Sequence, residues 1–211
     1  MRLFEVISAA GWPIYPLIIC SILAVAFVVE RFISLRAEKI MPAKLVDEAI
    51  GVSRSGIPAA EVVNQLEQNS LLGEILASGM RMLIANPRCS EEELRATMEA
   101  SGRSVAHRLE RFLGALGTIA SAAPLLGLLG TVIGMIEIFG SQGGGASTGG
   151  NPAQLAAGIS IALYNTAFGL IVAIPALIFW KYFRARVDEY LMKLELSTER
   201  FFRHLNGLRK R

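Results

Sequence analysis

Residues 123–140 read APLLGLLGTVIGMIEIFG, a stretch apolar enough to lie in a lipid bilayer. A passive membrane anchor needs only bulky apolar side chains, yet this stretch also carries residues that fill little space or are polar: Pro124, Gly127, Gly130, Thr131, Gly134 and Glu137. Such residues are tolerated in a membrane helix where it packs closely on other helices or lines a polar path. The stretch therefore predicts a membrane helix that does more than anchor the chain.

The distribution of charge extends this prediction to the whole chain. Of the 211 residues, 53% are hydrophobic, and Glu137 is the only charged residue between Arg111 and Lys181. A membrane helix needs about 20 apolar residues, and three segments reach that length: residues 13–33, 112–139 and 153–180. The predicted fold class is an all-α integral membrane protein, with three transmembrane helices and long cytoplasmic helical extensions.

The basic residues predict the orientation of these spans. Lys and Arg follow the first span, precede the second and follow the third, whereas residues 140–152 contain neither. Because basic loops stay in the cytoplasm, we expect residues 1–12 and the Gly-rich loop 140–152 in the periplasm. Residues 34–111 and the C-terminal helix 181–211 are then cytoplasmic.

Helix signals divide the cytoplasmic parts. Prolines and glycines favour short helices at 42–53, 58–68 and 71–85. Ser90 and Glu93 form a capping-box pattern that starts a helix, and with no strong breaker after it we expect one helix from Ser90 to about Phe139. The third span should continue into the C-terminal segment, where apolar residues at helical spacing predict packing against the Ser90 helix: Phe183, Val187, Tyr190, Leu194 and Phe201.

Several function classes find no support in the sequence. We find no nucleophile triad, no paired acid–base carboxylates and no phosphate-binding loop, so an enzyme is not expected. Cys20 lies within the first predicted span and Cys89 lies in the cytoplasmic segment, so the two cannot form a disulfide with each other. Neither cysteine has the spacing of a metal ligand, so neither a metal nor a cofactor is predicted. The net charge of +3 is too small and dispersed to predict nucleic-acid binding.

Small residues recur every three or four positions in the second and third spans, which places them on one helix face in each. We expect these faces to pack closely on each other; they comprise Pro124, Gly127, Gly130, Gly134, Gly158, Ala162 and Gly169. At helical rise, Thr131 lies about 12 Å from the outer end of its span and Thr166 about 15–20 Å from the outer end of its own. Two hydroxyls at similar depth, with Asn165 beside one, predict a polar lining where helices converge.

The motifs LLGLLGTVIGM and GISIALYNTAFGLIVAIP resemble the signature of the MotA/TolQ/ExbB proton-channel family, and the three-span topology resembles its ExbB/TolQ-like branch. The resemblance implies an inner-membrane homopentamer around an ExbD- or TolR-like single-span partner. Proton flow would move that partner and transmit energy to a TonB- or TolA-like periplasmic effector. By motif position, Thr131 and Thr166 would line the pore beside a partner aspartate.

The chain departs from this family pattern at one position. Where the family usually has a glutamate one turn before the second threonine, this chain has Ile161, which cannot relay a proton. Glu137 is the only carboxylate in the second and third predicted spans, and two interpretations stay open: a stand-in at the channel mouth, or a headgroup-level residue facing water. The departure also keeps an alternative function open, a non-conducting membrane scaffold for a single-span partner.

Overall fold

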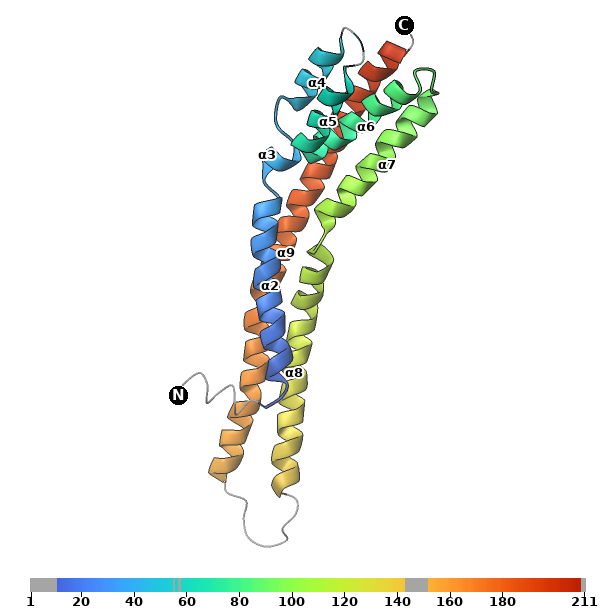
Figure 1. The fold of residues 1–211 in the computed structure, drawn as a ribbon. Helices are drawn as coiled ribbons and strands as arrows, with labels where there is room; N and C mark the ends of the chain where they lie inside the picture. Colours follow the sequence, from blue (N-terminus) through green and yellow to red (C-terminus); the bar gives the residue numbers. More distant parts are fainter. Residues whose placement is uncertain (1–10, 55, 57, 143–151, 210–211) are drawn as a thin grey trace. The chain divides into compact units, whose positions relative to one another are not determined.

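The computed structural model describes residues 11–54, 56, 58–142 and 152–209. Within those residues every regular element is a helix, as predicted (Figure 1). The helices are α2 (Ile14–Ser34), α3 (Ala37–Ile40), α4 (Leu45–Ser53), α5 (Ala60–Asn69), α6 (Leu71–Ala85), α7 (Glu91–Glu110), α8 (Leu113–Gln142) and α9 (Pro152–Arg209). Three apolar stretches are long enough to cross a membrane, in Ile14–Ser34, Glu91–Gly140 and Leu155–Arg209.

The chain forms two compact units, and both α2 and α9 contribute to each. We call Met1–Glu30 with Phe112–Tyr182 the membrane unit, and Arg31–Arg111 with Phe183–Arg211 the polar unit. Each unit therefore combines segments that are distant in the sequence.

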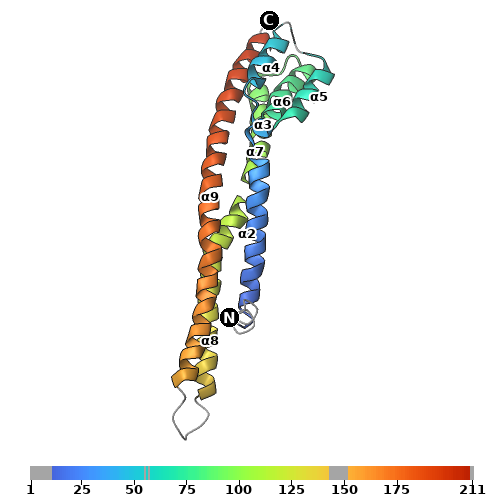
Figure 2. The same cartoon turned by 90° about the vertical axis from the view of Figure 1, so that its left-hand side faces the viewer.

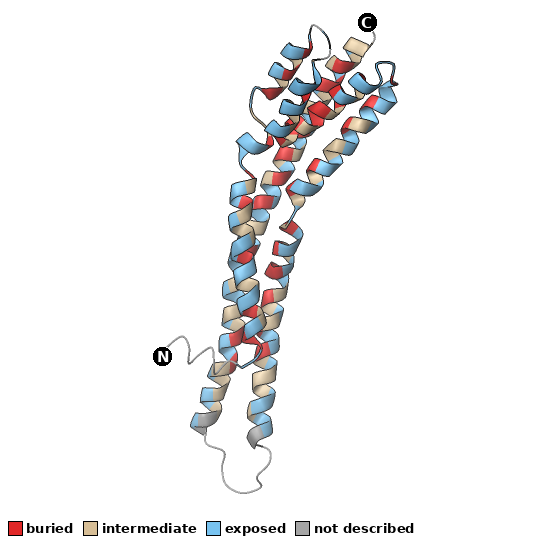
Figure 3. Cartoon of the chain, viewed as in Figure 1, coloured by how far each residue is buried: buried red, intermediate tan, exposed pale blue. Residues whose placement is uncertain are grey.

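In the membrane unit, α2, α8 and α9 meet at a small apolar core. Leu17, Ala123 and Ala173 are buried there, one from each helix. The opposite faces carry exposed apolar residues such as Leu125, Ile136 and Ile171, and Figure 3 shows how much of these helices is exposed. An apolar surface of this extent is stable in lipid or against other subunits, but not in water.

The polar unit has a conventional apolar core built from α6, α7 and α9. All five residues of the predicted α9 stripe, from Phe183 to Phe201, are buried. The helices approach closely at Gly79 of α6, where an added Cβ would lie 2.8 Å from Met98 Sδ and 2.9 Å from Leu205 Cδ1. The α9 stripe is therefore buried inside the unit. The sequence predicted packing against the Ser90 helix, whereas two stripe residues contact the end of α2: the Phe183 ring packs edge-on against Phe32 with centroids 5.0 Å apart, and the Tyr190 hydroxyl donates to the carbonyl of Leu35 at 3.4 Å.

The helix boundaries of the polar unit follow local signals closely. The Ser90 hydroxyl accepts the amide of Glu93 at 3.0 Å, and the Ser90 amide donates to the Glu93 carboxylate at 2.7 Å, which confirms the capping box. The third predicted short helix, 71–85, has the expected bounds, and Ser70 caps it. The first two begin two or three residues later than expected, since their prolines precede the first helical turn instead of opening it.

The prediction of one helix from Ser90 to Phe139 is wrong. Helix α7 ends at Glu110 and α8 begins at Leu113, because Arg111 is extended and Phe112 has a φ of 63°. Such a φ is unfavourable for a bulky residue, so tertiary contacts must compensate. The Phe112 ring stacks on Phe27 with centroids 5.1 Å apart, and the buried Arg31 guanidinium donates to the carbonyl of Leu109 at 2.9 Å.

His204 predicts a pH dependence of the polar unit. Its Nε2 lies 2.9 Å from the hydroxyl of the buried Ser53, which itself donates to the carbonyl of Ala49. Burial, followed by the positive charge of Arg54, lowers the pKa of His204 below its usual 6.5. Protonation then costs more in the folded chain than in the unfolded chain. Stability should be complete above pH 6.5 and decline as the pH falls below that value.

Thermal unfolding of the detergent-solubilised protein at pH 7.5 and 5.5 checks this expectation. The His204→Gln variant keeps an N–H donor for Ser53 but does not titrate, so it should lose less stability between the two pH values than the wild type. An equal loss in both proteins would show that other groups carry the pH dependence.

Candidate functional site

The two predicted threonines meet between α8 and α9. The hydroxyl oxygens of Thr131 and Thr166 lie 2.5 Å apart, and both side chains are half-buried. Thr131 Oγ1 is also 3.2 Å from the carbonyls of Gly127 and Ala162, and Thr166 Oγ1 is 3.3 Å from that of Gly127. We call Thr131 and Thr166 the hydroxyl pair. Two hydroxyls with several acceptors around them can change donors and acceptors without leaving their positions.

The hydroxyl pair is this close because glycines bring the two helix backbones together. A Cβ at Gly127 would lie 2.7 Å from the carbonyl oxygen of Asn165, and one at Gly169 would lie 2.6 Å from that of Ala123. Helices α8 and α9 run alongside each other through the membrane unit (Figures 1 and 2). In the membrane, such contacts replace the hydrophobic effect as the basis of helix association.

The remaining small residues occupy the same seam between the helices. Gly134 faces Ala162, since an added Cβ would lie 3.1 Å from the Ala162 Cβ, and Gly158 faces Ile138 at 2.7 Å. Pro124 lies inside α8 and is half-buried. Proline removes one backbone hydrogen bond from the helix, so α8 is locally less constrained one turn before Gly127.

Asn165 and Glu137 do not join the hydroxyl pair. Asn165 is only 2% exposed, and its side chain lies against Gly130, where an added Cβ would be 2.8 Å from the Asn165 Cβ. Glu137 is exposed. Both residues line a cavity of about 180 Å³ beside the start of α2; its other lining residues include Trp12, Ile133 and Ile161. We call this space the α2-side cavity.

Helix geometry explains the separation. Neighbouring residues of an α-helix point about 100° apart, so Gly130 and Thr131 face different directions, as do Asn165 and Thr166. Ala123, Gly130 and Glu137 are spaced by seven residues and therefore share the α8 face toward α2. The sequence predicted that Asn165 shares one polar lining with the two threonines and left the place of Glu137 open, whereas the structure has the hydroxyl pair on one flank of the seam and Asn165 and Glu137 at the α2-side cavity on the other.

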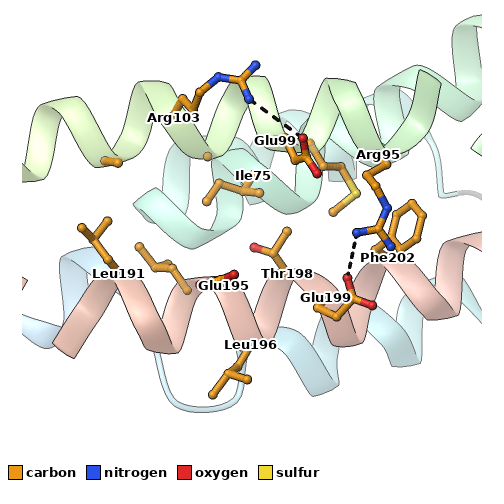
Figure 4. Close-up of a pocket in the computed structure, with 14 residues that line it drawn as sticks. Ile75, Arg95, Glu99, Arg103, Leu191, Glu195, Leu196, Thr198, Glu199 and Phe202 are labelled. Atoms are coloured by element: carbon orange, nitrogen blue, oxygen red, sulfur yellow. Dashed lines mark ion pairs between the residues drawn. The ribbon is translucent and has the colours of Figure 1, made fainter. Parts of the chain in front are cut away.

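The polar unit contains a larger groove, of about 700 Å³, that the sequence did not suggest. It lies between α7 and α9 over an apolar floor that includes Ile75, Met98 and Phe202. Figure 4 shows the charged residues at its rim: Arg95 pairs with Glu199 at 3.4 Å and Arg103 with Glu99 at 3.9 Å. Arg95 also lies 4.4 Å from the centre of the Phe202 ring. These ion pairs largely neutralise the charges at the rim of the groove.

In the described parts of the chain, no group of three or more His, Cys, Asp or Glu side chains could hold a metal ion.

Comparison with known proteins gives one consistent family. The model of the MotA/TolQ/ExbB proton channel family matches residues 67–196. The putative biopolymer transport protein ExbB-like 3 of Synechocystis is 33% identical over 202 residues, which cover 92% of this chain and 93% of that protein. The biopolymer transport protein exbB1 of Vibrio cholerae is 32% identical over 189 residues, covering 88% and 80%.

More distant similarity agrees with this result. The Tol-Pal system protein TolQ of Haemophilus influenzae is 32% identical over 111 residues, which cover 51% of this chain and 48% of that protein. Among solved structures, the fold is similar to the structure of C. jejuni MotAB, with a TM-score of 0.56 and 21% identity over 90% of this chain and 74% of that chain.

Proposed function

The chain belongs to the MotA/TolQ/ExbB proton channel family, in its ExbB/TolQ-like branch, and from this membership we propose that it is the ring-forming subunit of a motor driven by the proton-motive force. The observation that carries the proposal is the hydroxyl pair. It lies between two closely packed membrane helices, outside the lining of the α2-side cavity, and both threonine residues are partly exposed.

The hydroxyl pair suits a partner that brings its own carboxylate. A carboxylate is costly in hydrocarbon when charged and needs hydrogen-bond donors there. Thr131 and Thr166 supply two hydroxyls that donate to a carboxylate and accept from a carboxylic acid. The pair therefore stabilises a neighbouring acid in both protonation states. A carboxylate that gains and loses a proton in each cycle requires this.

The energy available is sufficient for mechanical work. One charge moving through 100 mV releases about 2.3 kcal/mol, and hydrogen bonds between membrane helices are individually worth about 0.6–2 kcal/mol. A few protons per step are therefore enough to exchange one set of helix contacts for another. Close packing along the small-residue seam holds α8 and α9 together as one surface against which a partner helix can move.

The assembly we propose is a homopentamer in the bacterial inner membrane around an ExbD- or TolR-like single-span protein. The N-terminus is periplasmic and the C-terminus cytoplasmic, following the basic residues. The partner transmits movement to a TonB- or TolA-like periplasmic effector. The extensive apolar exposure of α2, α8 and α9 supports burial of these helices in lipid and in neighbouring subunits.

Proton uptake into reconstituted vesicles tests the proposal. With a potential imposed, vesicles that hold this chain together with a single-span partner carrying a membrane aspartate should acidify. Vesicles with either protein alone, or with the partner aspartate replaced by asparagine, should not. A complex that assembles but carries no protons would instead support the non-conducting scaffold, the alternative favoured by Ile161 at a cavity-lining position.

A further inference from the structure

The α2-side cavity has polar groups at its two ends and apolar walls between them. Glu137 is exposed at one end, whereas Asn165 is 2% exposed and lies at the level of Gly130. Seven residues of helix separate Gly130 from Glu137, a distance of about 10 Å. The cavity therefore reaches from an accessible carboxylate to a buried amide.

The volume and the polarity together fit water. Liquid water occupies about 30 Å³ per molecule, so a cavity of this size has room for about six. An internal space lined only by apolar groups stays dry, whereas polar groups that can hydrogen-bond water allow it to fill. Glu137 accepts and Asn165 both donates and accepts, so a file of waters has a polar partner at each end.

From this geometry we infer that the α2-side cavity is a hydrated branch, within each subunit, that admits protons from the outer side to the level of the hydroxyl pair. This inference rests on the proposed function. Glu137 accepts a proton from a hydronium ion in the outside water and passes it to the first water of the file. Glu137 is then charged again, and the file of waters carries the excess proton as hydronium. No bond other than O–H bonds forms or breaks.

The inner end of the branch lies beside the hydroxyl pair. Gly130 precedes Thr131 and Asn165 precedes Thr166, so both polar sites occupy the same depth on either side of the seam. The carboxylate at the mouth also gives the cavity a negative charge, which attracts cations and raises their local concentration. On this account Glu137 belongs to the pathway as a collecting group, and not to the surface that faces the partner.

Cysteine labelling from the outer side tests the inference directly. Cys20 and Cys89 are first replaced by alanine, and Ile161, on the cavity wall, is then changed to cysteine. The control is Ser160→Cys, which is at the same depth, nearly isosteric and exposed on a different face of α9. The probe is a membrane-impermeant cationic methanethiosulfonate. Because it reacts with the thiolate, which needs water, we expect the Ile161→Cys variant to react at least about tenfold faster than the control.

Equal labelling of the two variants would overturn the inference, because it would show that depth alone sets access. Ile133→Cys, on the α8 wall of the same cavity, repeats the test if the first variant does not fold. Adding Glu137→Gln should slow the labelling of Ile161→Cys by removing the attracting charge. Proton uptake in vesicles tests the proposed function separately. If the complex conducts protons but the two cysteine variants are labelled equally, the hydrated branch is refuted and the proposed function is not.

Discussion

Replacing Thr131 or Thr166 with valine is expected to lower partner-dependent proton uptake at least about tenfold while the complex still assembles. Valine has nearly the shape of threonine, so the packing of α8 on α9 is preserved, but the hydroxyl is lost. A hydrogen bond to a charged group contributes about 1.5–3 kcal/mol, and a rise of about 1.4 kcal/mol in a barrier slows a step about tenfold. The double variant should be little worse than either single one, because the two hydroxyls act together.

Thr118→Val is the matched control for this experiment. Thr118 is also on α8 and is exposed, and its hydroxyl donates to the carbonyl of Gly114 at 2.9 Å within its own helix. Uptake should therefore stay at the wild-type rate. If the Thr131 and Thr166 variants carried protons as fast as the Thr118 variant, the hydroxyl pair would have no role in conduction.

Alanine at Gly127 or Gly169 should destabilise the membrane unit by about 1–3 kcal/mol, the usual cost of overpacking. In both cases the added methyl group meets backbone, at 2.7 Å and 2.6 Å respectively, which cannot rotate away as a flexible side chain can. The helices must separate, and the hydroxyl pair must separate with them. We therefore expect lower uptake as well as a lower unfolding temperature in detergent.

Gly114→Ala is the control, since it is also on α8 and nothing lies within 4 Å of the Cβ it would gain. Alanine in a helix is more favourable than glycine by about 0.5–1 kcal/mol, so this variant should be as stable as the wild type or slightly more so. Similar losses of stability at Gly114 and at Gly127 would show that helix propensity, and not close packing, explains the effect.

Features set by periodicity and local chemistry were predictable from the sequence. Three apolar segments of membrane length, the Ser90 capping box and the buried α9 stripe are each encoded within a few turns of helix. The contact between Thr131 and Thr166 was also within reach, because the two residues have similar depth and lie in small-residue faces. The first three features depend on residues that are close in the sequence or that repeat at fixed spacing along one helix, and the contact between the two threonines follows from matching such patterns in two helices.

Two kinds of feature were not predictable in this way: the direction in which a side chain points around its helix axis, and contacts between residues that are distant in the sequence. The break at Arg111 and Phe112 has no glycine or proline to signal it, and its contacts come from Phe27 and Arg31 in another helix. Depth alone grouped Asn165 with Thr166, although neighbouring residues diverge by about 100°. The α2-side cavity exists only once α2 is placed beside α8 and α9.

Disulfide cross-linking tests whether the hydroxyl pair faces the acidic helix of a single-span partner. Thr131→Cys, in a chain without its native cysteines, is combined with single cysteines along the partner's membrane helix. We expect oxidation to cross-link it to positions within one turn of the partner's aspartate, since a disulfide needs Cα atoms about 4.4–6.8 Å apart. If Ser160→Cys formed those cross-links and Thr131→Cys formed none, the partner would lie on another face and the account would be contradicted.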